Sequence, residues 1–148
     1  MRLPNKAGVI VADGEKYLVL RNHGEGFRID LRVEETRSEP NPSHSAELGS
    51  DRPGRFPRPA SSARETVEET DWKRLAKEVF ATSLAEHVNR AVKGGDFKKL
   101  VIVADARTLG VLRSRFDDRA RSAILHEIEG DYTRHTLPDI TTMLNRAE

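Results

Sequence analysis

An unbroken apolar run from Leu100 to Ala104 places the strongest constraint on how this chain can fold. A strand with one wet face alternates apolar and polar residues, whereas a continuous apolar strand needs cover on both faces. Asp105 ends the run, and a helical pattern follows near residues 108–115. The run therefore predicts the central strand of a sheet that carries helices, which means an α/β fold.

Three short strands are predicted ahead of this run. Residues 7–12 and 17–20 are apolar, and Asp13-Gly14 between them is a strong hairpin signal. Apolar and charged residues then alternate from Phe27 to Val33, as expected for a half-buried third strand. We expect the chain to open with three antiparallel strands.

The clearest helical signal begins near Thr70-Asp71 and ends at Gly94-Gly95. Apolar residues recur at helical spacing from Trp72 to Val92, which predicts one long amphipathic helix. Residues 123–129 fit either a helix or an edge strand, and we favour the strand. A capping-box-like start at Thr136 predicts the last helix.

Together these elements predict one domain over residues 1–148 with the order β-β-β-α-β-α-β-α. The expected architecture is an α/β fold with a mixed five-stranded sheet in a ribonuclease H-like layout. If residues 123–129 were helical, a four-stranded α/β sandwich would result.

A long polar segment, residues 37–69, separates the third strand from the long helix. It is rich in Pro, Arg and Ser and has no periodicity, so we expect a loop. Four arginines stand against one aspartate between residues 51 and 64, a local charge of +3.

Within this segment, the run from Glu47 to Arg55 combines two glycines, a proline and two arginines. Such a run can turn the backbone and present guanidinium groups to a carboxylate, a phosphate or a partner's backbone. An equally weighted alternative pairs Asp51 with an arginine and folds the loop over the same protein or a second subunit. The candidate recognition residues are Gly49, Asp51, Arg52, Pro53, Gly54, Arg55 and Arg58.

Composition excludes several kinds of site. The chain has no cysteine, and its five histidines are scattered without ligand spacing, so we expect no zinc site. No apolar run is long enough to cross a bilayer, and no charged-then-apolar leader is evident, so we expect a cytoplasmic protein without membrane insertion. The net charge of +1 means that nucleic-acid contact would need a local basic cluster. We expect no cofactor and no catalytic residue. The sequence is compatible with a homo-oligomer.

Asp13 and Asp105 suggest one further alternative, because they follow the first and the central strand. Ribonuclease H-like nucleases hold two metal ions between carboxylates at such strand ends. A turn residue and a helix cap explain the two aspartates more simply. A metal-dependent nuclease is therefore the second alternative.

Four stretches together resemble a known bacterial family: residues 48–55, the helix over 72–92, residues 99–110 and residues 127–133. In combination they are similar to the "protein required for attachment to host cells" family. Members of that family are considered relatives of the middle domain of archaeal and eukaryotic peptide-release factors. The resemblance implies an indirect link to bacterial attachment and a release-factor-like fold.

Release factors hydrolyse peptidyl-tRNA with a Gly-Gly-Gln tip between the third strand and the long helix. This chain contains no glutamine, and its Gly94-Gly95 follows the helix as a C-terminal cap. The resemblance thus implies a non-enzymatic binding or regulatory protein of the host-attachment family with an unknown protein partner. The first alternative is an RNA- or ribosome-associated module that lacks the catalytic tip.

Overall fold

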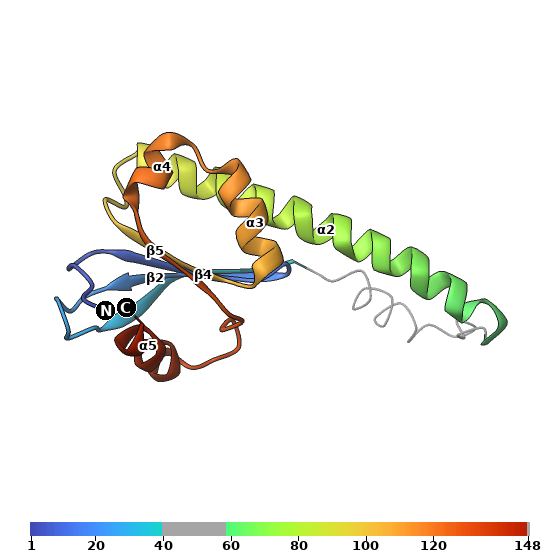
Figure 1. Ribbon diagram of the computed structural model, residues 1–148, viewed down its shortest axis with the longest axis horizontal. Helices are drawn as coiled ribbons and strands as arrows, with labels where there is room; N and C mark the ends of the chain where they lie inside the picture. Colours follow the sequence, from blue (N-terminus) through green and yellow to red (C-terminus); the bar gives the residue numbers. More distant parts are fainter. Residues whose placement is uncertain (40–58, 148) are drawn as a thin grey trace.

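The computed structural model describes residues 1–39 and 59–147 as one α/β domain built on a mixed five-stranded sheet (Figure 1). The strands are β1 (Gly8–Ala12), β2 (Lys16–Asn22), β3 (Leu31–Ser38), β4 (Leu100–Ala104) and β5 (Ile124–Glu129). The helices are α2 (Pro59–Lys93), α3 (Ala106–Arg115), α4 (Asp118–Ala123) and α5 (Leu137–Arg146). The predicted fold class is confirmed, with the second helical segment divided into α3 and α4 and the ambiguous segment before Gly130 forming a strand.

The strand order is β3-β2-β1-β4-β5. The hairpins β1–β2 and β2–β3 are antiparallel, whereas β4 pairs in parallel with both β1 and β5. The strands β1, β4 and β5 therefore point the same way, and their carboxyl ends lie side by side at the same end of the sheet.

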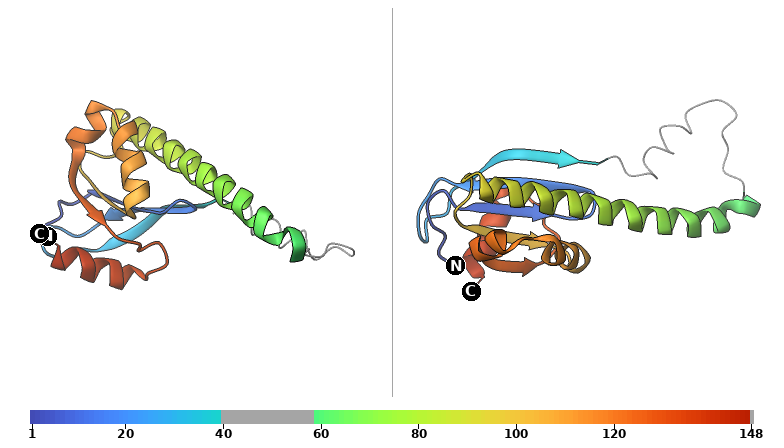
Figure 2. Two further views of the ribbon diagram at one scale, coloured as in Figure 1. Left: turned by 45° about the vertical axis from the view of Figure 1, so that its right-hand side comes forward. Right: turned by 90° about the horizontal axis from the view of Figure 1, so that it is seen from above.

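Helices cover both faces of the sheet. In the views of Figures 1 and 2, α2, α3 and α4 lie on one face and α5 lies on the other. Alternate residues of β4 enter the two cores: Ile102 joins the cluster of Phe80 from α2, and Val101 joins that of Ile140 from α5. All five residues of β4 are buried, as its apolar run predicts.

The third strand begins later than the alternating pattern indicates. It starts at Leu31, and Phe27 in the alternating segment is exposed. The physical reason is Asn22, whose fully buried side chain accepts hydrogen bonds from the backbone amides of Gly24 and Asp30, each 2.9 Å long. These bonds hold the segment before β3 in an irregular connection instead of a strand.

Helix α2 starts at Pro59, inside the segment 37–69 that the sequence predicts to be a loop. The helix therefore begins well before the expected start at Thr70, and β3 continues to Ser38, so the predicted loop is too long at both ends. The added first turns are rich in good helix formers such as Ala, Arg and Glu, and proline suits a first helical position. They lack apolar periodicity, which is why the pattern does not reveal them.

The amphipathic pattern of α2 also overstates its burial. Phe80 and Leu84 are buried against the sheet, whereas Trp72, Leu75 and Val79 expose 59%, 52% and 61% of their surface. Figure 1 shows the reason, because the N-terminal half of α2 extends beyond the sheet. Only the C-terminal half of the helix has a layer to pack against.

The helix ends follow the predicted signals. Asp105 caps α3 by accepting a hydrogen bond from the backbone amide of Thr108, and Thr136 caps α5 by accepting one from that of Asp139. Gly95 follows α2 with a φ of 84°, a conformation that glycine adopts without strain.

Two glycines provide a matched test of this packing. A Cβ added at Gly8 would lie 2.5 Å from the ring of Phe97, whereas one added at Gly110 in α3 would meet open space. We expect Gly8→Ala to lower the free energy of unfolding by about 1 to 3 kcal/mol through overpacking. We expect Gly110→Ala to raise it by about 0.5 to 1 kcal/mol, because alanine favours the helix. Urea denaturation measures both, and equal stability of the two variants would contradict the packing around Gly8.

Candidate functional site

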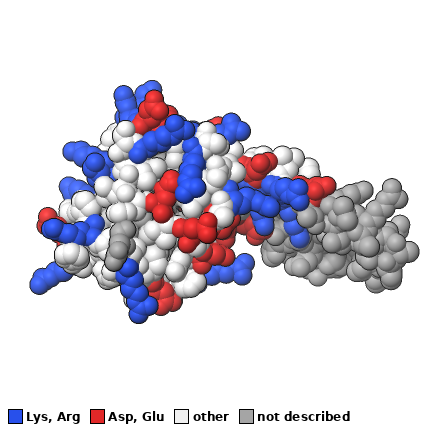
Figure 3. All heavy atoms as spheres, viewed as in Figure 1, with Lys and Arg blue, Asp and Glu red and all other residues white. Residues whose placement is uncertain are grey.

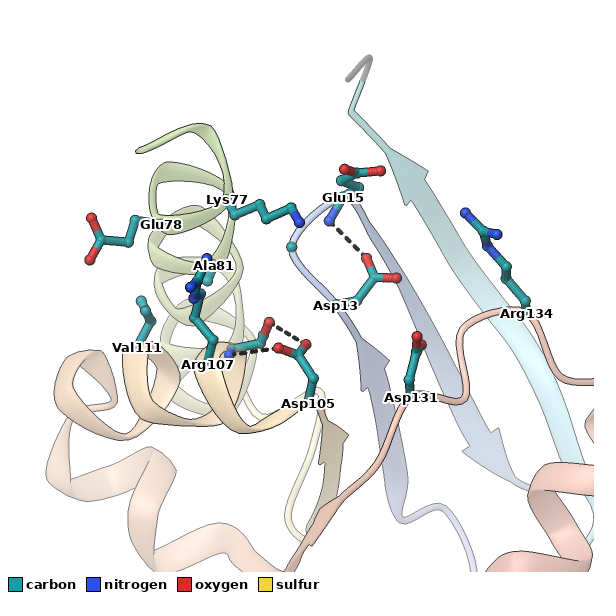
Figure 4. Close-up of a pocket in the computed structure, with 12 residues that line it drawn as sticks. Asp13, Glu15, Lys77, Glu78, Ala81, Asp105, Arg107, Val111, Asp131 and Arg134 are labelled. Atoms are coloured by element: carbon teal, nitrogen blue, oxygen red, sulfur yellow. Dashed lines mark hydrogen bonds between the residues drawn. The ribbon is translucent and has the colours of Figure 1, made fainter. Parts of the chain in front are cut away.

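The described residues form a polar cleft where the carboxyl ends of β1, β4 and β5 meet (Figure 4). An aspartate follows each of these strands, namely Asp13, Asp105 and Asp131, and helices α2 and α3 close the cleft on one side. Its volume is about 430 Å³. Ligand sites in open α/β sheets favour such strand ends, which makes the cleft the first candidate.

Asp13 is held by hydrogen bonds within the domain. Its Oδ1 accepts from the backbone amides of Glu15 and Lys16, each at 2.7 Å, and closes the β1–β2 hairpin. Its Oδ2 accepts from the hydroxyl of buried Thr133 at 2.8 Å. Asp13 therefore acts as a turn residue that also ties the C-terminal segment to β1.

Asp105 has a structural role of the same kind. Its carboxylate accepts from the hydroxyl of Thr108 at 2.6 Å and from the backbone amide of that residue at 3.3 Å. Asp131, which the sequence reasoning missed, has a long contact of 3.4 Å with the Thr133 hydroxyl. The sequence did contain a signal for Asp131, because this residue lies just after the end of a predicted strand, as Asp105 does.

The cleft gives the nuclease alternative no support. Within residues 1–39 and 71–147, no three His, Asp or Glu side chains are grouped so that they could hold a metal ion. A two-metal mechanism needs carboxylates free to bind the cations. Asp13 and Asp105 instead accept hydrogen bonds from their own turn and helix.

Charge further limits what the cleft can bind. Five carboxylates line it against three cationic groups, so its net charge is negative, which disfavours a polyanion. Figure 4 shows Lys77 and Arg107 on the helix side of the aspartates and Arg134 on the opposite side. The five carboxylates belong to Asp13, Glu15, Glu78, Asp105 and Asp131.

A second polar cluster joins α2 to the edge of the sheet. The carboxylate of Glu35 accepts a hydrogen bond from the Tyr17 hydroxyl at 2.8 Å and one from Nε2 of His87 at 2.9 Å. Partial burial acts to raise the pKa of Glu35, but the bonds from Tyr17 and His87 and the charges of His87 and Arg37 outweigh it and leave this pKa lowered. Burial, followed by the bond to Glu35 and its charge, raises the pKa of Tyr17.

The predicted recognition residues, from Gly49 to Arg58, lie outside the described residues. Their position in the chain is still informative, because the segment 40–58 joins β3 to the start of α2. In Figure 1, the N-terminus of α2 is the end of the helix that lies farthest from the sheet. Because its residues lie outside the described part of the chain, the recognition loop stays a prediction.

The sheet order and the long helix between β3 and β4 define the class of fold, a single α/β domain with a mixed five-stranded sheet and helices on both faces. The sequence model of the bacterial archaeo-eukaryotic release factor family 12 matches residues 6–144. The chain therefore belongs to this family. The match supports the release-factor relationship and gives no support to the host-attachment name.

No curated protein sequence matches the chain. Among the residues that the structure describes, no helix is both long and apolar enough to cross a membrane.

Asp13 and Thr133 can be tested as a structural pair. We expect Thr133→Val and Asp13→Asn each to lower the free energy of unfolding by about 1 to 3 kcal/mol, because each weakens a part-buried, charge-assisted hydrogen bond. In the double variant the losses should be less than additive, because the two residues share that bond. Urea denaturation of the parent, the two single variants and the double variant measures the coupling energy between Asp13 and Thr133. Fully additive losses would mean that the bond contributes nothing.

The Glu35 cluster predicts a pH dependence. A carboxyl whose pKa is lowered by folding stabilises the protein above its unfolded pKa of about 4.3, and this contribution disappears as pH falls through the folded value. Because both side chains of the His87–Glu35 pair are partly exposed, we expect Glu35→Gln to cost only about 0 to 1 kcal/mol at pH 7. The difference from the parent should shrink below about pH 4. Thermal unfolding from pH 3 to 7 measures it, and a difference that grows on acidification would refute the assignment.

Proposed function

We propose that this protein is a release-factor-related module that binds RNA or the ribosome without hydrolysing peptidyl-tRNA. The observation that carries the proposal is the family match over residues 6–144, which covers nearly the whole domain. The expected location of such a module is the cytoplasm.

The amino-acid sequence supports the proposed lack of hydrolysis. The chain contains no glutamine, so the Gly-Gly-Gln tip that release factors use cannot be assembled from it. A related fold without that tip can still bind, because the scaffold and the reactive tip are separate parts of a module.

The most suitable phosphate-binding residues are those of the predicted recognition loop. Arg52, Arg55 and Arg58 lie close together in the sequence, and arginine binds phosphate oxygens in a bidentate manner. The strand-end cleft is a poorer candidate, because its net charge is negative. Elsewhere, basic and acidic side chains are interspersed on the face seen in Figure 3.

Binding to purified ribosomes and to single-stranded RNA tests the proposal. We expect binding at low salt that weakens steeply as salt rises, because phosphate contacts release counterions. Arg52→Ala combined with Arg55→Ala should weaken binding about tenfold or more and make the salt dependence shallower. The matched control is Arg90→Ala with Lys93→Ala, which removes the same charge from exposed positions of α2. An absence of binding at low salt, or equal losses in both double variants, would refute the proposed recognition.

The same preparations test for chemistry. We expect no release of peptide from peptidyl-tRNA and no cleavage of labelled RNA with Mg²⁺ or Mn²⁺. RNA cleavage that disappears in Asp13→Asn and Asp105→Asn would restore the nuclease alternative. Cleavage that survives both substitutions would indicate contamination.

A further inference from the structure

Three large apolar side chains lie together on the outer face of α2. We name Trp72, Leu75 and Val79 the outer ridge. Their spacing of three and four residues places them on one side of the helix, and each is more than half exposed. Phe80 and Leu84 enter the core on the other side, so no element of the described domain covers the ridge.

The two sides of the outer ridge differ in charge. On the β3 side, a groove contains Arg37 and Glu39, whose side chains form an ion pair and neutralise each other. On the α3 side, a groove of about 470 Å³ contains Glu78, Glu86 and Arg115. In the described part of the chain, Glu78 and Glu86 make no ion pair, so this side has a negative charge that a partner can match.

We propose that the outer ridge docks a basic amphipathic helix of another protein. The apolar face of that helix would cover Trp72, Leu75 and Val79, and its lysines or arginines would pair with Glu78 and Glu86. Contiguous exposed apolar side chains with a polar rim are typical of protein interaction sites. Tryptophan is the residue most often found at the energetic centre of such sites.

Charge disfavours a second copy of this chain as the occupant. Two copies of α2 that pair antiparallel about a two-fold axis bring the same flank of each helix together. With Leu75 near the axis, Asp71 of one copy would then face Glu78 of the other. Asp71 has only a long, exposed ion pair of 3.8 Å with Arg74, and like charges brought close together oppose association. The small area of three side chains would not offset this opposition, since a stable interface buries roughly 800 Å² on each partner.

The chemistry of the outer ridge disfavours RNA as well. Trp72 could stack on a base, but Leu75 and Val79 have no aromatic face to continue the stacking. Glu78 and Glu86 beside them would repel the phosphate backbone. A basic helix uses all of these residues favourably, and the surface is therefore separate from the proposed RNA contact.

Trp72 reports directly on this surface, because it is the only tryptophan in the chain. The probe is a helical peptide of Leu, Ala and Lys with one apolar face, and its counterpart has Glu in place of every Lys. We expect the Lys peptide to shift the emission of Trp72 to shorter wavelength at low salt, and the Glu peptide to have no effect. Equal shifts with both peptides would overturn the proposal.

Two double variants locate the contact while keeping Trp72 as the reporter. Leu75→Ser with Val79→Ser should raise the dissociation constant of the Lys peptide at least tenfold, whereas Leu125→Ser, at an exposed position of β5, should leave it unchanged. Glu78→Lys with Glu86→Lys should reverse the preference in favour of the Glu peptide. Far-UV circular dichroism checks that each variant is folded, and a failure of either double variant to change binding would contradict the docking mode.

Three other outcomes would assign the surface to a different occupant and overturn the proposal. A shift that appears on raising the protein concentration alone would identify a second copy. A response to single-stranded RNA that matches that of the Lys peptide would identify a nucleic-acid surface. An emission already shifted in the dilute protein and insensitive to peptide would mean that the chain covers Trp72 itself.

Discussion

Burial of β4 on both faces is the interaction on which the rest of this structure depends. Its apolar side chains alternate between two cores, so helices must cover the sheet from both sides. This cover selects parallel pairing of β4 with β1 and β5, since the connections between parallel strands contain the helices. The same parallel direction brings Asp13, Asp105 and Asp131 together at one end of the strands, although these polar side chains are not part of the apolar core.

The two halves of helix α2 have different surroundings. Its C-terminal half completes the core through Phe80 and Leu84, and it is tied to the edge of the sheet by Glu35. Its N-terminal half extends beyond the sheet and leaves Trp72 in solvent. A helix that is anchored at one end can hold an outward apolar surface at a distance from the core.

Two carboxylates of the strand-end cleft contribute to the fold through hydrogen bonds. Asp13 and Asp105 accept hydrogen bonds from their own turn and helix, and Thr133 links Asp13 to the C-terminal part of the chain. The chain belongs to the release-factor family and contains no glutamine, so it has no Gly-Gly-Gln sequence. As proposed, the arginines of the predicted recognition loop and the outer ridge of α2 would bind two chemically different partners.

The sequence by itself determined the central strand, the hairpin at Asp13-Gly14, the caps at Asp105 and Thr136, and the absence of a Gly-Gly-Gln tip. These features depend on local hydrogen bonding, apolar periodicity or residue identity, which a sequence displays directly. Only the tertiary structure decided that β3 starts at Leu31, because a buried Asn22 organises the segment before it through side-chain bonds to the amides of Gly24 and Asp30, which apolar periodicity does not reveal. It also decided which apolar residues of α2 are buried. Helical spacing identifies the residues that share a side of a helix, but burial depends on where the sheet ends beneath it.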